Sequence, residues 1–128
     1  MNELTANVNW LAVAVGTVLS FIIGAFWFSP KVFGAKWLEG VGAKMKANAP
    51  VPMAAMVVQF IGTFLLAWLV GITAGQNALL TIILIVVTIV ALVIANGLFT
   101  NKSTYAMSAE SGFIVVMAVV MIVVQGIF

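Results

Sequence analysis

The residues in this chain that could do chemistry are a few polar side chains placed within long apolar stretches. Glu110 is the carboxylate nearest to such a stretch, and a helix beginning near Thr104 would hold it nearly two turns inside. Methionines and then Gln125 continue its face at helical spacing. Ionisable residues within membrane spans usually face a bundle interior or a watery cavity and often mark ion or proton pathways. A shorter helix beginning near Gly112 would instead leave Glu110 in a loop, and both interpretations stay open.

Amide side chains are the other polar candidates. Gln59, Asn96 and Gln125 fall within apolar stretches, and the first two could line a path together with Glu110. Such amides often form hydrogen bonds between membrane helices, worth about 0.6–2 kcal/mol each. Helix packing is therefore the favoured interpretation for each of them, and a substrate path is the alternative.

The residue types needed for common enzyme sites are missing from the sequence. It has no histidine and no cysteine, and it has no pair of carboxylates within one apolar stretch. We therefore expect no catalytic residues, no metal site, no cofactor and no enzymatic activity. The net charge of +2, without any basic run, also predicts no nucleic-acid partner.

The elements that must position these side chains follow from composition. The chain is 65% hydrophobic and 6% charged, with a mean hydropathy of +1.30, whereas a soluble domain has roughly 45–50% apolar and about 25% charged residues. The natural surroundings are therefore a lipid bilayer. About 20 apolar residues in a helix cross the roughly 30 Å of hydrocarbon. The sequence predicts an all-α, four-helix transmembrane domain over residues 1–128, with spans at about 8–29, 52–74, 78–100 and 104–127.

The lysines predict an orientation. All five fall in the two loops 30–51 and 101–103: Lys31, Lys36, Lys44, Lys46 and Lys102. Four spans place these two loops on one side of the membrane. Because lysine-rich loops stay in the cytoplasm, we expect both loops to be cytoplasmic and both termini to lie outside.

A stripe of small residues runs along the first span. It consists of Ala12, Gly16, Ser20 and Gly24, which recur every four residues. Small residues at this spacing allow another helix to approach closely. The stripe predicts packing, within the bundle or between protomers, more than a substrate path. It indicates a homo-oligomer or a subunit of a larger membrane complex.

The segment GAFWFSPKVFGAKWLEG follows the first span and is rich in aromatic residues. Pro30 disfavours helix at the residue before it and predicts a break. Aromatic rings are enriched at the membrane–water boundary, and the residues after the break could form a short amphipathic helix there. We interpret the segment as an interfacial elbow, in preference to a ligand site, formed by Trp27, Phe28, Pro30, Phe33 and Trp37.

The same region carries a family resemblance. The stretch NWLAVAVGTVLSFIIGAFWFSPKVFGAKWLEG resembles the opening of a bacterial membrane family called domain of unknown function 1761, with its Asn-Trp, Gly-x-x-Trp-Tyr-Ser-Pro and Phe-Gly-x-x-Trp pattern. The matching residues are Asn9, Trp10, Gly24, Trp27, Ser29, Pro30, Phe33, Gly34 and Trp37. Phe28 stands where tyrosine is usual, and Gly112-Phe113 is a weaker echo of a Gly-Tyr in the last helix. The resemblance implies a small four-span protein of the bacterial inner membrane and brings no established catalytic residues.

Two functional hypotheses follow. The first is a non-enzymatic structural or accessory membrane component. The alternative is a small oligomeric transporter or channel whose path is lined by Glu110, Gln59 and Asn96.

Overall fold

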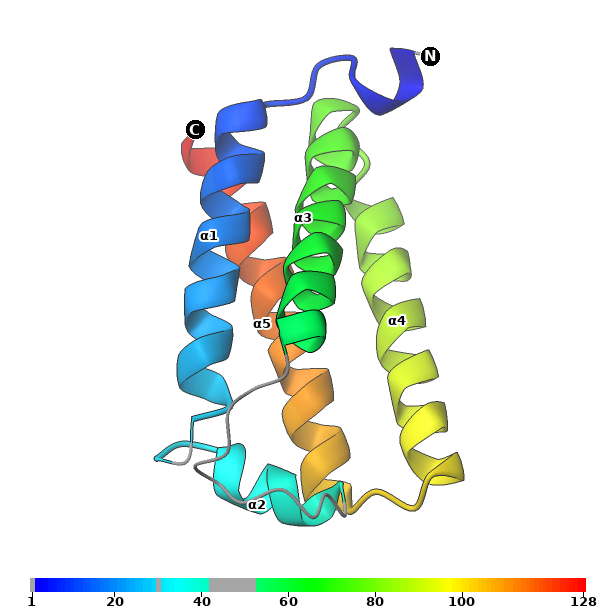
Figure 1. Cartoon of the computed structure of the whole chain (residues 1–128). Coiled ribbons are helices and arrows are strands. Elements are labelled where there is room, and N and C mark those ends of the chain that lie inside the picture. Colours follow the sequence, from blue (N-terminus) through cyan, green and yellow to red (C-terminus); the bar gives the residue numbers. More distant parts are fainter. Residues whose placement is uncertain (1, 30, 42–52) are drawn as a thin grey trace.

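A computed structural model describes residues 2–29, 31–41 and 53–128. Within these residues every regular secondary-structure element is a helix (Figure 1). The elements are η1 (Asn2–Leu4), α1 (Trp10–Trp27), α2 (Gly34–Gly40), α3 (Met53–Gly75), α4 (Leu79–Phe99) and α5 (Thr104–Ile127). The predicted all-α fold, with four long helices and a short helix between the first two, is confirmed.

Polar side chains fix where α1 and α5 begin. Asn9 Oδ1 accepts a hydrogen bond from the Ala12 backbone N–H at 3.1 Å. Ser103 Oγ accepts one from the Ala106 N–H at 3.0 Å. These N-caps satisfy backbone donors that the first turn of a helix leaves unpaired. The alternative in which the last helix begins near Gly112 is therefore wrong.

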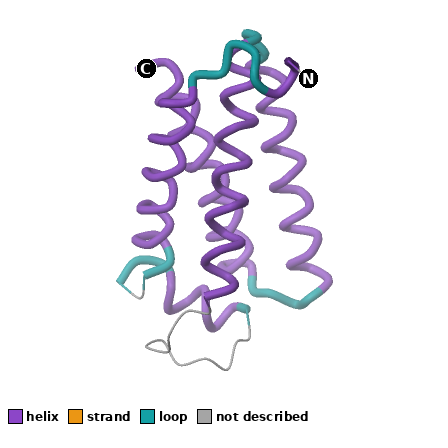
Figure 2. The backbone as a smooth tube through the Cα atoms, turned by 45° about the horizontal axis from the view of Figure 1, so that its top comes forward, coloured by secondary structure: helices purple, strands orange, loops and turns teal. Residues whose placement is uncertain are grey.

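The two ends of the bundle carry different connections. Figure 1 shows both termini and the α3–α4 turn at one end, with α2 and the α4–α5 connection at the other. Figure 2 shows the four long helices running between these ends. The described parts of the two lysine-bearing loops thus share one end, as four spans require. At the opposite end the Ala78 N–H donates to the Thr73 carbonyl at 2.8 Å, and Asn77 takes a φ of 55°, a conformation that asparagine tolerates.

The core is centred on α5, which packs against α1, α2, α3 and α4. Phe113, Met117, Ala118 and Met121 of α5 are buried, and they meet buried residues of α1, α3 and α4. The outer surface is apolar, with Leu80 80% exposed and Phe99 88% exposed. Among the residues that the structure describes, four helices are long and apolar enough to cross a membrane, so the molecule is a multi-pass membrane helical bundle.

Candidate functional site

The segment between α1 and α2 turns back over the start of α5. The Phe33 N–H donates to the Trp27 carbonyl at 3.2 Å, and the Gly34 N–H donates to the Ser29 carbonyl at 2.8 Å. Gly34 is required by close approach, because a Cβ there would collide with the Phe28 carbonyl oxygen. These contacts direct the aromatic side chains of the segment toward α5.

An aromatic cluster holds α1, α2 and α5 together. Phe28 packs edge-on against Trp37 and Phe113, with ring centroids 5.1 and 5.3 Å apart. Trp27 packs against Phe33 at 4.8 Å, and its Nε1–H donates to the Ala109 carbonyl at 2.9 Å. The members of the aromatic cluster are Trp27, Phe28, Phe33, Trp37, Tyr105 and Phe113. Ring pairs of this kind are worth about 0.5–1.5 kcal/mol each.

Gly24 allows α1 to approach this cluster. A Cβ at Gly24 would lie 2.8 Å from Cζ of Phe113. Phe113 is only 6% exposed and lies beside Trp27 and Phe28, so its ring has little room to move aside. The glycine therefore sets the distance between α1 and α5 at this level.

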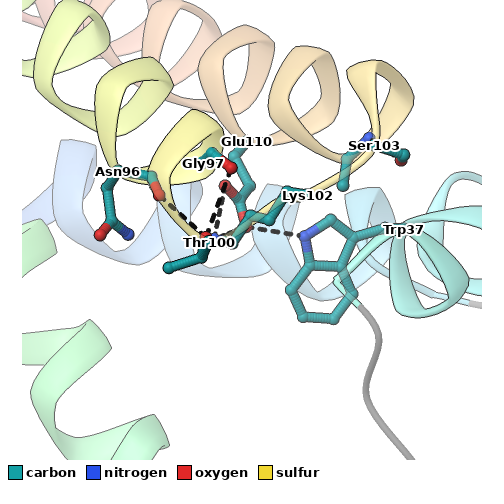
Figure 3. Close-up of polar contacts among 8 residues, drawn as sticks. Trp37, Asn96, Gly97, Thr100, Lys102, Ser103 and Glu110 are labelled. Atoms are coloured by element: carbon teal, nitrogen blue, oxygen red, sulfur yellow. Dashed lines mark hydrogen bonds and ion pairs between the residues drawn. The ribbon is translucent and has the colours of Figure 1, made fainter.

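Glu110 lies at the edge of the same cluster. Lys102 Nζ donates to Glu110 Oε1 at 3.1 Å and to Oε2 at 3.0 Å, and Trp37 Nε1–H donates to Oε2 at 3.0 Å (Figure 3). The Lys102 and Glu110 side chains are 20% and 17% exposed. We call these three residues the α2–α5 clamp. The charges cancel within the clamp, and both carboxylate oxygens accept hydrogen bonds.

The backbone supports the clamp. The Ser103 N–H donates to the Gly40 carbonyl at 2.9 Å, which joins the end of α2 to the start of α5. The Lys102 N–H donates to the Gly97 carbonyl at 2.9 Å, which fixes the lysine after the end of α4. Lys102 and Trp37 therefore reach Glu110 from two different connections.

The family model described as "Protein of unknown function (DUF1761)" matches residues 11–126, nearly the whole chain. The chain belongs to this family. No curated protein and no solved structure gives a significant match. The DUF1761 assignment confirms the resemblance inferred from the sequence.

The structure joins two features of this DUF1761 protein that the sequence left separate. Trp37 closes the aromatic elbow and also donates its indole N–H to Glu110. A usable signal existed, because a packed tryptophan needs an acceptor for its N–H and Glu110 is the carboxylate of the last predicted span. The Trp27 bond had no such signal, since its acceptor is a backbone carbonyl.

The three residues proposed to line one path lie in different surroundings. Gln59 is exposed on α3, and its Nε2 donates to Thr63 Oγ1 at 3.3 Å. Asn96 is exposed near the end of α4, and its backbone carbonyl accepts a hydrogen bond from Thr100 Oγ1 at 2.8 Å (Figure 3). Glu110 is held in the clamp. Among the described residues, no hydrogen bond joins any two of the three.

Two hollows open on the bundle surface. One, of about 520 Å³, lies between α3, α4 and α5, and its lining includes Gln59, Thr63 and Met117. The other, of about 250 Å³, lies near the α3–α4 turn, and its lining includes Asn77 and the half-buried Gln125. Glu110 and Asn96 are not among the described residues that line either hollow.

The small-residue stripe of α1 faces α5. Ala12, Gly16 and Ser20 are buried, and a Cβ at Gly16 would lie 3.4 Å from Met121 Cγ. Gly24 likewise lies against Phe113, so both glycines of the stripe contact side chains of α5 in the same chain. The Ser20 hydroxyl is buried and has no hydrogen-bond partner among the described residues.

The orienting lysines fall into two groups. Lys31 and Lys36 are exposed near α2, and the Lys36 ammonium lies 5.5 Å from the centre of the Tyr105 ring. Lys102 is neutralised by Glu110. Pro30, Lys44 and Lys46 lie outside the described residues. Within the described residues, no three His, Cys, Asp or Glu side chains gather as metal ligands would.

Proposed function

We propose that this DUF1761 protein is a non-enzymatic structural or accessory component of the bacterial cytoplasmic membrane. The observation that carries the proposal is that both oxygens of the Glu110 carboxylate are paired within the chain. Glu110 accepts from Lys102 at 3.0 and 3.1 Å and from Trp37 at 3.0 Å, all within one chain. A residue that carries protons must exchange them with water on two sides. The contacts of Glu110 instead hold α2, through Trp37, and the α4–α5 connection, through Lys102, against α5.

The Lys102–Glu110 ion pair is largely buried, as expected of a structural contact. Removing one member of a largely buried pair leaves an uncompensated charge and is strongly destabilising, whereas an intact pair adds little net stability. The value of the clamp is therefore specificity, because it fixes which face of α2 meets α5. The neighbouring aromatic cluster and the Ser103–Gly40 backbone bond serve the same contact.

The proposed orientation puts α2 and the α4–α5 connection in the cytoplasm and both termini outside. Two exposed lysines near α2, Lys31 and Lys36, support it, since positive loops are retained on the cytoplasmic side. The cysteine-free sequence allows a direct test. In intact cells an impermeant thiol reagent should label Gln76→Cys and leave Lys36→Cys unlabelled; the reverse pattern would overturn the orientation.

Flux measurements test the proposed function itself. Purified protein is reconstituted into liposomes of phosphatidylethanolamine and phosphatidylglycerol, and an entrapped pH dye reports the decay of an imposed gradient. We expect the gradient to decay no faster in liposomes that hold the wild type or Glu110→Gln than in empty liposomes. As a control, a protonophore should collapse the gradient completely in all three. Proton flux that Glu110→Gln abolishes would sink the proposal. The structural role also predicts that crosslinked membranes yield the protein bound to a second copy or another subunit.

The second candidate function is a small oligomeric transporter or channel. It is favoured by the hollow of about 520 Å³ between α3, α4 and α5, whose otherwise apolar lining includes the exposed Gln59 and the buried Thr63. In the same liposomes, a flux that survives Glu110→Gln and is lost in Gln59→Leu would favour this candidate over the structural role.

A further inference from the structure

The first half of α3 has no buried face. Every residue from Met53 to Gly62 is exposed, whereas the second half of the helix buries Thr63, Leu66, Ala67 and Val70. The Phe60 ring, 5.5 Å from Phe21 of α1, still leaves 46% of that residue exposed. Lipid can cover exposed apolar side chains, so these residues do not by themselves require a protein partner. The polar groups of the segment therefore indicate what covers it.

A groove runs along one side of this segment. Its volume is about 520 Å³, and its floor is formed by α4 and α5. The lining residues are Ala55, Val58, Gln59, Gly62, Thr63, Leu66, Ile89, Ile114 and Met117. A Cβ built on Gly62 meets nothing within 4 Å. The backbone of α3 is therefore open to close approach at the centre of the groove.

Gln59 presents an incompletely paired amide in this groove. One N–H donates to Thr63 Oγ1 at 3.3 Å, and that hydroxyl donates to the Gln59 carbonyl at 2.7 Å. The second N–H and Oε1 have no hydrogen-bond partner among the described residues. Gln59 lies six residues after Met53, about 9 Å along the helix at 1.5 Å per residue. In the hydrocarbon of a bilayer an acyl chain offers no hydrogen bond, and an unsatisfied polar group is costly.

We propose that the groove docks the same face of α3 from a second copy of this chain, with the two Gln59 amides paired across a two-fold axis. A primary amide carries both a donor and an acceptor, so it complements itself when a two-fold axis places it opposite its own copy. Lipid cannot supply this pairing. The open backbone at Gly62 lets the two helices approach closely enough for the amides to meet.

The dimer surface that the α1 stripe suggested is already occupied. The stripe on α1 indicated a neighbouring helix, and α5 of the same chain is that neighbour through Met121 and Phe113. The proposal rests on the proposed function only in assigning the lipid-facing surface to assembly. Its tests measure association, whereas the proposed function is tested by flux, so either can fail alone.

Cysteine crosslinking in native membranes tests the geometry. Ala55→Cys and Val58→Cys place thiols on the groove side, while Val57→Cys and Ile61→Cys place them on the opposite side of the same turns. Mild oxidation should give a disulfide-linked dimer several-fold more efficiently for the first pair than for the second. Equal crosslinking in both pairs, or none in the first, would overturn the proposal, as would crosslinking of the groove side to another protein.

Association measurements test the residues. In detergent micelles, energy transfer between labelled copies should report a dimer whose dissociation constant rises about 3- to 30-fold in Gln59→Leu, the range expected for one membrane hydrogen-bond contact. Gly62→Leu fills the groove and should abolish the signal. Gly126→Leu is the matched control, since Gly126 is also open and lies outside the groove; it should leave dimerisation unchanged.

Folding is monitored in the same samples by circular dichroism, where all three variants should keep wild-type helix content. A wild type that stays monomeric over the full range of protein-to-detergent ratios, or copurifies with lipid in place of a second copy, contradicts the proposal. So does an unchanged dissociation constant in both Gln59→Leu and Gly62→Leu.

Discussion

The α2–α5 clamp and the first half of α3 differ in how far their side chains find partners within the chain. In the clamp, the Lys102 ammonium and the Trp37 indole N–H both donate to the Glu110 carboxylate. In the first half of α3, each residue is exposed and the Gln59 amide is only partly paired.

The difference shows what holds helices together in lipid. Apolar side chains gain little from leaving lipid for a protein interior, so packing, hydrogen bonds and close backbone approach decide which faces pair. The clamp end of the bundle has all three, in its aromatic cluster, its indole bonds and the close approach at Gly24. The first half of α3 has Gln59 and Gly62, and the contact of Phe60 with Phe21 of α1 leaves its groove side unpaired within the described residues.

The largest expected effect is at Trp27. Trp27→Ala removes the bond to the Ala109 carbonyl and the ring contacts with Phe33 and Phe113. The lost hydrogen bond and two ring pairs predict a destabilisation of about 2–4 kcal/mol, measured by SDS-induced unfolding followed by circular dichroism. Phe26→Ala is the control, because Phe26 is 68% exposed. Equal losses in both variants would show that ring packing at this end is not specific.

Close helix approach is tested at Gly24. Gly24→Ala introduces a Cβ 2.8 Å from the Phe113 ring, and overpacking of this kind costs about 1–3 kcal/mol. Gly126→Ala meets nothing within 4 Å and should be neutral or stabilising by up to about 1 kcal/mol, the helix propensity gain. The two variants should therefore change the free energy of unfolding in opposite directions or by clearly different amounts. A neutral Gly24→Ala would mean that α1 and α5 lie farther apart than the structure has them.

Features that depend on neighbouring residues could be predicted from the sequence, whereas contacts between distant residues could not be predicted in full. The four helices and the N-cap of α5 were predictable, because apolar runs and a serine before a helix are local patterns. The clamp was predictable only in part. The need of a packed tryptophan for an acceptor was a signal, but Trp37 and Glu110 are 73 residues apart and no spacing rule pairs them. The α1 stripe indicated a neighbouring helix, but it could not say which helix, because α5 of the same chain and a second copy satisfy the same pattern.

The ion pair is tested by a double-mutant cycle. Lys102→Met leaves Glu110 with the indole as its remaining described donor, whereas Glu110→Gln keeps an acceptor for Trp37. We expect a coupling energy of about 1 kcal/mol between the two positions, within the range for contacting residues, and a greater loss for Lys102→Met than for Glu110→Gln. The unfolding free energies of the two single variants and the double variant give the coupling. Additive losses would mean that the two side chains act independently.

The smallest effect is expected in the first half of α3. Ile61 is 51% exposed on the side opposite the groove, so Ile61→Ala should change the unfolding free energy by less than about 0.5 kcal/mol. Leu66→Ala, one and a half turns further along, is the matched contrast because Leu66 is 7% exposed in the core, and it should cost about 2 kcal/mol or more. The ratio of the two losses measures how sharply α3 changes from a lipid-facing to a core helix. A loss at Ile61 as large as that at Leu66 would mean that the first half of α3 packs against another part of the same chain on the side away from the groove.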